Sequence, residues 1–201
     1  MVNTDKRMEM PKRAQVALRF LEETLRPLGA VWAVGGSTGL LLQGGVLAAE
    51  PRDLDLYADE DDARVIHCAL AAFATDEQEW NETEIYRSLL SHYEIEGVSV
   101  ELVGAFEVRA QASEYAVRTR YMTEAYPATS QLDNGREIRL MPLVHELIFN
   151  VLRERPDRYE AVAAVCRRSG RHTHAELLNE LARRSRFSPP VRRRLDQLLE
   201  L

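Results

Sequence analysis

The sequence predicts an α+β fold, with a mixed β-sheet flanked by helices and a C-terminal helical extension. Three observations support this class: helical spacing of apolar residues near the amino terminus, period-two alternation in short segments of residues 31–140, and helical spacing again from Pro142 onward. The chain has 201 residues, 45% of them hydrophobic, which suits one globular domain or a smaller domain with a helical extension. We expect the boundary near residue 141, with a domain over 1–141 and a helical region over 142–201.

Residues 11–27 have the pattern of an amphipathic helix. The apolar stripe consists of Ala14, Ala17, Leu18, Leu21, Leu25 and Leu28. Pro27 and Gly29 are expected to end this helix, because proline lacks a backbone donor and glycine readily adopts the left-handed conformation. Residues 31–34 are uninterrupted apolar residues, as expected of a buried strand, and a short apolar helix is predicted after Gly36.

The middle of the chain is predicted to contain most of the sheet. Residues 53–57 alternate acidic and apolar side chains, which is typical of a half-buried strand. Asp59 is expected to cap the next helix. The buried face of that helix would carry Val65, Ile66, Ala69, Leu70 and Phe73. Further strands are expected at 84–94, 98–103, 115–121 and 136–140, and the stretch around Trp80 is expected to be a loop.

Helical spacing continues from Pro142 to the end of the chain. Thr173 to Glu176 has the sequence of a capping box and is expected to open a second helix there. Ser188 followed by Pro189 combines an N-cap residue with proline at the first helical position, so the last helix is expected to begin at this point.

The formal net charge of -6 conceals an asymmetry. From Arg167 to Leu201, nine arginines stand against four carboxylates, so this segment carries about +5 and the rest of the chain about -11. An acidic body can bind cations, and a basic tail could contact an anionic partner such as RNA. Solvated helix faces of mixed charge would explain both features as well. The arginines that could contact RNA are Arg183, Arg184, Arg186, Arg192, Arg193 and Arg194.

We expect a cytoplasmic protein without a membrane segment. The amino terminus is charged and polar, unlike a signal peptide, and no apolar run reaches the length of a membrane-spanning helix. Cys68 and Cys166 each lie in an apolar stretch that reads as helix, so both are expected to be buried small side chains without a disulfide or metal role.

Asp53 and Asp55 are the first candidate functional residues. In a strand, residues two apart point to the same face, so the two carboxylates would project together while Leu54 and Leu56 point away. Carboxylates this close repel each other unless a cation lies between them, and Mg²⁺ binds carboxylate, water and phosphate oxygens. Acidic pairs also occur on solvated strand faces, so the pair alone does not identify a metal site.

Gly35-Gly36-Ser37 lies between a predicted buried strand and a predicted helix. Backbone N–H groups at such a junction can bind an anion, and glycine lets the anion approach without meeting a Cβ atom. Ser37 would add a hydroxyl donor. The same residues would also serve a tight strand-to-helix turn that binds no ligand.

Glu101 lies inside the apolar strand segment 98–103. Ser99, Glu101 and Val103 would share one face of this strand, and Val98, Val100 and Leu102 the other. Burial of a lone carboxylate is costly. Glu101 is therefore expected either to belong to a functional site or to face solvent on an edge strand.

These segments, in this order, resemble the nucleotidyltransferase superfamily related to DNA polymerase β. The resemblance rests on Ala33-Val34-Gly35-Gly36-Ser37, on Arg52-Asp53-Leu54-Asp55-Leu56 and on Val100-Glu101-Leu102. It covers residues 30–105, and residues 141–159 are similar to the helical segment that follows the catalytic core. Among the branches, the chain looks most like aminoglycoside and lincosamide nucleotidyltransferases and nucleotidyltransferase toxins of the AbiEii kind. The resemblance implies the nucleotidyltransferase fold, with residues 1–141 as its catalytic domain.

The resemblance also implies an activity. Asp53 and Asp55 would bind one or two Mg²⁺ ions, and Glu101 would share the second ion or help to deprotonate the acceptor hydroxyl. A nucleoside monophosphate would pass from a nucleoside triphosphate such as ATP to a hydroxyl of a small molecule, such as an antibiotic, with release of pyrophosphate.

The resemblance places the triphosphate on Gly35-Gly36-Ser37, which would hold its β- and γ-phosphates. Arg52 could approach a phosphate or be an ordinary surface arginine. Relatives often carry a lysine in the helix after residue 141, where this chain has Asn150 with Arg153 and Arg155 nearby. A phosphate contact could therefore have moved or been lost.

Two alternatives remain open at this stage. A toxin-like enzyme would modify tRNA or protein instead of a small molecule, which the basic tail slightly favours. A non-catalytic nucleotide-binding domain would keep the fold with a decayed site. The oligomeric state does not follow from the sequence.

Overall fold

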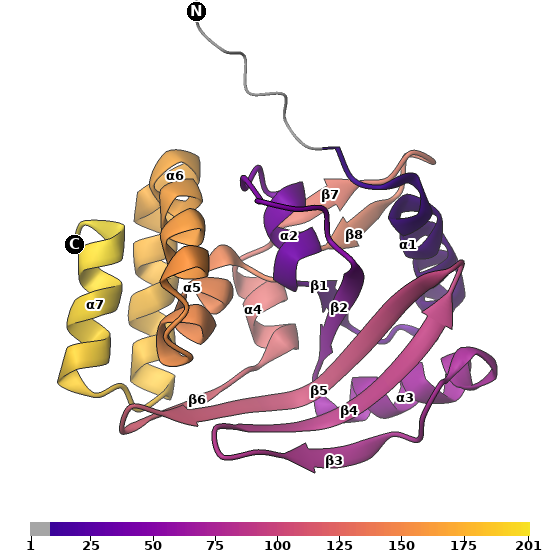
Figure 1. Ribbon diagram of the computed structural model, residues 1–201, viewed down its shortest axis with the longest axis horizontal. Helices are drawn as coiled ribbons and strands as arrows, with labels where there is room; N and C mark the ends of the chain where they lie inside the picture. Colours follow the sequence, from indigo (N-terminus) through magenta and orange to yellow (C-terminus); the bar gives the residue numbers. More distant parts are fainter. Residues whose placement is uncertain (1–8) are drawn as a thin grey trace, which may run out of the picture.

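The computed structural model describes residues 9–201 and contains a mixed sheet with helices on both faces (Figure 1). The main sheet has the strand order β1-β2-β5-β4-β3, and β6 pairs with β5. Its strands are β1 (Trp32–Val34), β2 (Asp53–Ala58), β3 (Glu79–Glu82), β4 (Tyr86–Ile95), β5 (Val98–Ala110) and β6 (Ser113–Ala116). β2 and β5 run parallel, whereas the other neighbouring pairs are antiparallel. The predicted α+β class is confirmed.

Seven α-helices and a two-stranded sheet complete the described part of the chain. The helices are α1 (Lys12–Leu25), α2 (Gly36–Leu42), α3 (Glu60–Leu70), α4 (Thr119–Ala125), α5 (Leu143–Leu152), α6 (Pro156–Arg184) and α7 (Pro189–Leu199). The small sheet pairs β7 (Thr129–Gln131) with β8 (Glu137–Arg139). Over residues 9–201, no helix combines the length and the apolar character needed to cross a bilayer.

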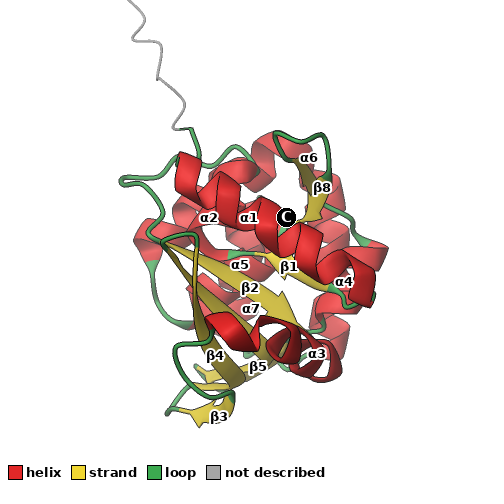
Figure 2. Ribbon diagram, turned by 90° about the vertical axis from the view of Figure 1, so that its right-hand side faces the viewer, coloured by secondary structure: helices red, strands yellow, loops and turns green. Residues whose placement is uncertain are grey.

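The two faces of the main sheet carry different cores (Figures 1 and 2). On one face, α1 and α3 pack against the strands, with Leu18 and Ile66 fully buried against residues such as Leu54 and Val100. On the other face, α5, α6 and α7 belong to a second apolar cluster that includes Tyr115 of β6. Apolar burial on both faces fixes the register of the strands, because a shift of one residue would exchange the two faces.

The side chains of β2 alternate between the two faces of the sheet, and one of these faces is only partly covered by helices. Leu54 and Leu56 are fully buried on the α1 and α3 face. The other face carries Asp53, Asp55 and then Tyr57, and burial increases along this series from exposed to buried. Tyr57 packs against other aromatic residues under α5. The first half of β2 therefore presents its two carboxylates at an uncovered part of the sheet.

The first predicted helix is slightly shorter than expected. α1 ends at Leu25 and continues as a 3₁₀ turn over Arg26–Leu28, after which Gly29 takes a φ of 67°. Leu28 was assigned to the apolar stripe, but its position in the 3₁₀ turn leaves it 45% exposed. Val65 of α3 and Phe73, which lies in the 3₁₀ turn after α3, are likewise exposed rather than buried, because the face that contacts the sheet is narrow.

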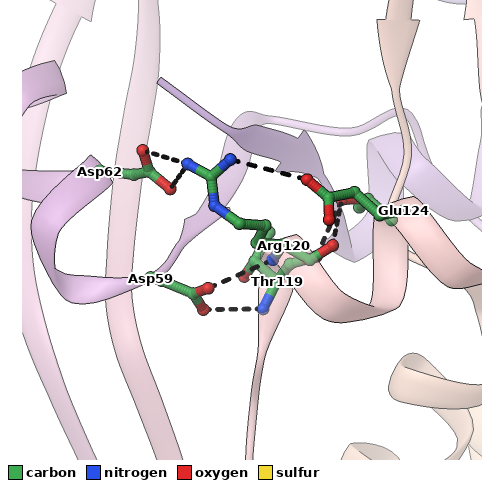
Figure 3. Close-up of polar contacts among 6 residues, drawn as sticks. Asp59, Asp62, Thr119, Arg120 and Glu124 are labelled. Atoms are coloured by element: carbon green, nitrogen blue, oxygen red, sulfur yellow. Dashed lines mark hydrogen bonds and ion pairs between the residues drawn. The ribbon is translucent and has the colours of Figure 1, made fainter. Parts of the chain in front are cut away.

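Residues 115–121 do not form one strand, since β6 ends at Ala116 and α4 begins at Thr119. The backbone N–H of Thr119 donates to Oδ1 of Asp59 at 2.8 Å, and that of Arg120 donates to Oδ2 at 3.3 Å (Figure 3). The Arg120 guanidinium also contacts Asp62 and Glu124. Asp59 directly precedes α3, but its side chain caps α4. Asp59 thus occupies the N-cap position of α3, as predicted, but its side chain makes no capping hydrogen bond to that helix.

Two smaller predictions are wrong, and a third is right only in part. Trp80 lies in strand β3 at the edge of the sheet, not in a loop, and the Arg87 guanidinium lies 3.9 Å from the centre of its ring. Cys68 is exposed, whereas Cys166 is buried as expected. A second helical segment does begin close to the predicted point, after the break in α6 at Gly170, where φ is 129°, but Thr173 lies inside this segment and not at its N-cap. The last helix does begin after Ser188, as predicted.

Candidate active site

Most of the predicted site residues line one cleft of about 720 Å³. They are Gly36, Ser37, Arg52, Asp53, Asp55 and Glu101. The uncovered part of β2, β4 and β5 contributes one side of the cleft, the loop after α2 a second, and α5 with the start of α6 a third. Residues far apart in the sequence therefore meet in one place.

The three predicted acids lie on two neighbouring parallel strands. In the register between β2 and β5, Asp55 is the direct partner of Glu101, and Asp53 is the partner of Ser99. β5 lies between β2 and β4, so the alternative that places Glu101 on an edge strand is wrong. The Glu101 side chain is 40% exposed because it faces the cleft, not because its strand is peripheral.

Negative charge is in excess around Asp55. Burial, together with the neighbouring Asp53, Glu101 and Glu146 carboxylates, raises the pKa of Asp55 to about 7 against the opposing effect of Arg153. A cation would relieve this repulsion. Within residues 9–201, no three His, Cys, Asp or Glu side chains are close enough together to form a ligand set as they stand. The donors facing the cleft are nevertheless carboxylate oxygens, which Mg²⁺ prefers, so their chemistry fits this ion.

The two glycines at the start of α2 are each needed for a different structural reason. Gly36 has a φ of 58°, and a Cβ atom there would overlap the Asp55 carboxylate. Gly35 has an extended conformation, and a Cβ atom there would overlap the ring of Tyr57. Gly36 lines the cleft, whereas Gly35 lies beneath it and donates its N–H to the carbonyl of Asp55 at 2.9 Å. Of the three residues of this turn, Gly36 and Ser37 line the cleft and Gly35 does not.

Glu146 is a cleft residue that the sequence analysis did not identify. It lies on α5, is buried, and accepts a 2.6 Å hydrogen bond from the backbone N–H of Gly36. Burial raises the pKa of Glu146, while the Gly36 N–H and the charges of Arg153 and Arg158 act in the opposite direction. The sequence did contain a signal for Glu146. It is an acidic residue inside an apolar helix, and such a residue needs a specific partner when it is buried.

Two arginines bring positive charge to the α5 and α6 side of the cleft. Arg158 donates from Nη1 to Oγ of Ser37 at 2.9 Å. Arg153 donates from Nε and Nη2 to Oδ1 of Asn150 at 3.0 and 2.7 Å, and its guanidinium lies 4.3 Å from the centre of the Phe149 ring. Asn150 thus orients an arginine at the place where relatives often carry a lysine.

Arg155 does not share this position. It pairs with Asp157 through two hydrogen bonds of 3.0 and 2.8 Å and does not line the cleft. Of the two arginines noted near Asn150, Arg153 is therefore the one that faces the candidate site.

A histidine stands beside the third acid. His92 of β4 is the register partner of Glu101, and its Nε2 lies 3.5 Å from Oε2 of Glu101. Its Nδ1 contacts Oδ2 of Asp76. Partial burial lowers the pKa of His92, but the hydrogen bond and charge of Asp76 and the charge of Glu101 together raise it above its ordinary value.

The arginines of the basic tail are largely paired within the chain. Arg183 and Arg184 contact Glu180, Arg186 contacts Glu114, Arg192 contacts Asp196, and Arg194 contacts Glu160. Exposed ion pairs of this kind are typical of solvated helix surfaces. The structure thus accounts for these arginines without a nucleic-acid partner.

The mixed sheet, the glycine turn before α2 and the acids of β2 and β5 above one cleft define the protein as a nucleotidyltransferase. More specifically, residues 17–149 match the aminoglycoside-2''-adenylyltransferase family, and the chain belongs to this family.

Solved structures agree on the fold. A protein of Thermotoga maritima described as a nucleotidyltransferase is 22% identical, with a TM-score of 0.58 over 89% of this chain and 99% of its own. The solution structure of the antibiotic-resistance factor ANT(2'')-Ia is 12% identical, with a TM-score of 0.55 over 87% of this chain and 94% of its own. A comparison with curated proteins gives no match.

Proposed function

We propose that this protein is a Mg²⁺-dependent nucleotidyltransferase that transfers a nucleoside monophosphate from a nucleoside triphosphate to a hydroxyl group of a small molecule, such as an antibiotic. One observation carries the proposal: Gly36 and Ser37 line the same cleft as Asp53, Asp55 and Glu101. A phosphate-binding turn and a set of cation-binding acids are the two parts that this reaction needs in contact.

Asp53, Asp55 and Glu101 would hold one or two Mg²⁺ ions. The raised pKa of Asp55 supports this assignment, because it reflects a carboxylate that is buried among other carboxylates, and a bound cation would stabilise its charged form. When bound, the ions would neutralise charge on the phosphates and on the attacking and leaving oxygens.

The triphosphate would lie between the acids of the sheet and the α5 and α6 side of the cleft. Gly36 and Ser37 would contact its β- and γ-phosphates, and Gly35 would support this turn from below. Arg153 and Arg158 supply positive charge on the α5 and α6 side, and Arg52 lines the cleft near the acids. Asn150 and Phe149 hold the Arg153 guanidinium in place before any ligand binds, which lowers the cost of ordering it.

This placement of the acids and the triphosphate supports transfer of a nucleoside monophosphate. The acceptor oxygen would attack the α-phosphorus, the bond to the leaving pyrophosphate oxygen would break, and Glu101 would help to remove the hydroxyl proton. The protein would contribute mainly positioning and charge. Glu101 and the net charge of -6 suit an acceptor that carries amino groups.

Calorimetric titration with ATP, CTP, GTP and UTP in the presence of Mg²⁺ tests the proposal. At least one triphosphate should bind, and the Asp53→Asn/Asp55→Asn variant should bind it at least about tenfold more weakly. The matched control is Glu9→Gln/Asp61→Asn, which also removes two carboxylates but at exposed positions outside the cleft. The proposal fails if no triphosphate binds, or if the two double variants bind equally well.

Pyrophosphate release would then be measured with aminoglycosides and lincosamides as acceptors. A small-molecule acceptor should give turnover that depends weakly on salt. A tRNA acceptor would instead give binding that falls steeply as salt rises, because phosphate contacts release counterions. Nucleotide binding without turnover on any acceptor would favour the non-catalytic alternative.

A further inference from the structure

Glu101 has a longer side chain than the other two acids, Asp53 and Asp55. Its extra methylene adds a rotatable bond, so the carboxylate can take more positions above the sheet than an aspartate could. The Glu101 side chain is 40% exposed, so packing alone does not restrict it. A glutamate at this place needs another group to hold its carboxylate in one position.

His92 lies where such a group is needed. It is the direct partner of Glu101 on the neighbouring strand β4, so the two Cα atoms are fixed by the sheet. Its Nε2 lies 3.5 Å from Oε2 of Glu101. This contact involves only one of the two carboxylate oxygens, and Glu101 itself lines the cleft.

The imidazole ring is itself held on its other side. Oδ1 of Asp76 accepts the backbone N–H of His92 at 2.7 Å, and Oδ2 contacts Nδ1 of the same residue. A carboxylate that contacts both the backbone and the ring restricts rotation of the imidazole. Asp76, His92 and Glu101 therefore form a continuous chain of contacts from the loop before β3 to the third acid of the cleft.

The stability of the fold does not explain this arrangement. All three side chains are more than a third exposed, and exposed ion pairs contribute little to the free energy of unfolding. By contrast, groups that orient metal-binding carboxylates and imidazoles commonly change metal affinity or activity by about 10–100-fold when they are removed.

Building on the proposed function, we infer that His92, held by Asp76, is a positioning residue that fixes the Glu101 carboxylate so that one of its oxygens faces the cation site. His92 acts through Glu101 and contacts neither the triphosphate nor the acceptor. The inference predicts that His92 matters only while Glu101 carries its carboxylate.

Manganese binding to the full-length protein tests this dependence, with Mn²⁺ as the probe and the free ion measured by electron paramagnetic resonance. His92→Ala should weaken Mn²⁺ binding about tenfold, as expected for loss of a group that orients a ligand. His92→Gln, which keeps an N–H donor at nearly the same reach, should recover part of this loss. In the Glu101→Gln background, His92→Ala should have no further effect.

His172→Ala is the matched control, because His172 also pairs with a glutamate, at 3.2 Å, but is 89% exposed on α6, outside the cleft. It should leave Mn²⁺ binding unchanged. The inference is overturned if His92→Ala weakens binding equally in both backgrounds, if it has no effect, or if it lowers the melting temperature enough to unfold the protein.

The same titration separates this inference from the proposed function. If Asp53→Asn/Asp55→Asn leaves Mn²⁺ binding unchanged, the proposed cation site is wrong and the role of His92 falls with it. If that double variant loses Mn²⁺ while His92→Ala retains full affinity, only the role of His92 is wrong.

Discussion

The backbone N–H of Gly36 donates a 2.6 Å hydrogen bond to Oε1 of the buried Glu146. This contact joins the glycine turn before α2 to helix α5, although the two residues are 110 positions apart. It satisfies a donor that faces the cleft, and it places a third carboxylate, after those of Asp53 and Glu101, beside Asp55. The shape of the glycine turn therefore depends on a residue from the helical region.

Replacement of Glu146 should show how much this hydrogen bond contributes. Glu146→Gln keeps a side-chain oxygen for the Gly36 N–H, whereas Glu146→Ala leaves that donor buried without a partner. An unpaired buried donor costs about 1–3 kcal/mol, so Glu146→Ala should have a lower free energy of unfolding than Glu146→Gln by this amount. Urea denaturation of both variants measures the difference. Equal stability would show that water replaces the carboxylate at no cost.

Gly36 should tolerate no side chain. Gly36→Ala forces alanine into a left-handed conformation, which costs about 1–2 kcal/mol, and it also brings a methyl group against the Asp55 carboxylate. We expect loss of stability together with loss of triphosphate binding in calorimetry.

Gly97→Ala separates these two effects. Gly97 has a φ of 70°, but a Cβ atom there would meet nothing within 4 Å. This control should lose stability only and should bind triphosphates normally. Normal binding by Gly36→Ala as well would mean that the turn does not contact the ligand.

Asp59 should stabilise α4, a helix that begins 60 residues later. Asp59→Ala removes the acceptor of the first N–H groups of α4, at Thr119 and Arg120, which should cost about 0.5–2 kcal/mol. Glu124→Ala is the control on the same helix, because the Glu124 side chain is 63% exposed and contacts Arg120 only at 3.6 Å. It should change the free energy of unfolding by less than about 0.5 kcal/mol. Equal losses in thermal denaturation would contradict the capping role.

The parts of the fold that local pattern determines were predictable. The alternation in β2 correctly placed Leu54 and Leu56 in the core and Asp53 and Asp55 on the other face, because strand geometry has a period of two. The break at Gly36 was predictable for a similar reason, since its positive φ favours glycine. The relation of Glu101 to these residues followed only from the family resemblance.

The parts that depend on distant contacts were missed. α4 has Arg118 at its N-cap position, which is no helix signal, and the residue that caps it belongs to another segment. Trp80 lies on an exposed edge strand whose side chains do not alternate in burial, so no period-two pattern marks it. Glu146 appeared as a single acid in an apolar helix, and its partner was visible only after folding.

His145 should make the protein less stable in mild acid. Burial lowers its pKa to about 3 from 6.5, with a smaller contribution from Arg153. Its Nδ1 lies 3.1 Å from the Tyr115 hydroxyl, and its Nε2 is buried without a hydrogen-bond partner among the described residues. The folded protein therefore excludes a proton that the unfolded chain accepts below pH 6.5. The stability linked to this group is complete above that pH and is lost as the pH falls toward 3.

The size of this effect can be bounded and isolated. One proton bound only by the unfolded chain lowers the free energy of unfolding by at most about 1.4 kcal/mol per pH unit. His145→Gln keeps a polar group beside Tyr115 but cannot take up the proton, so its stability should fall less steeply between pH 6.5 and pH 4. Urea denaturation across this range, with both proteins in the same buffers, cancels the contribution of the carboxylates that they share. Parallel curves for the two proteins would show that His145 does not cause the acid sensitivity.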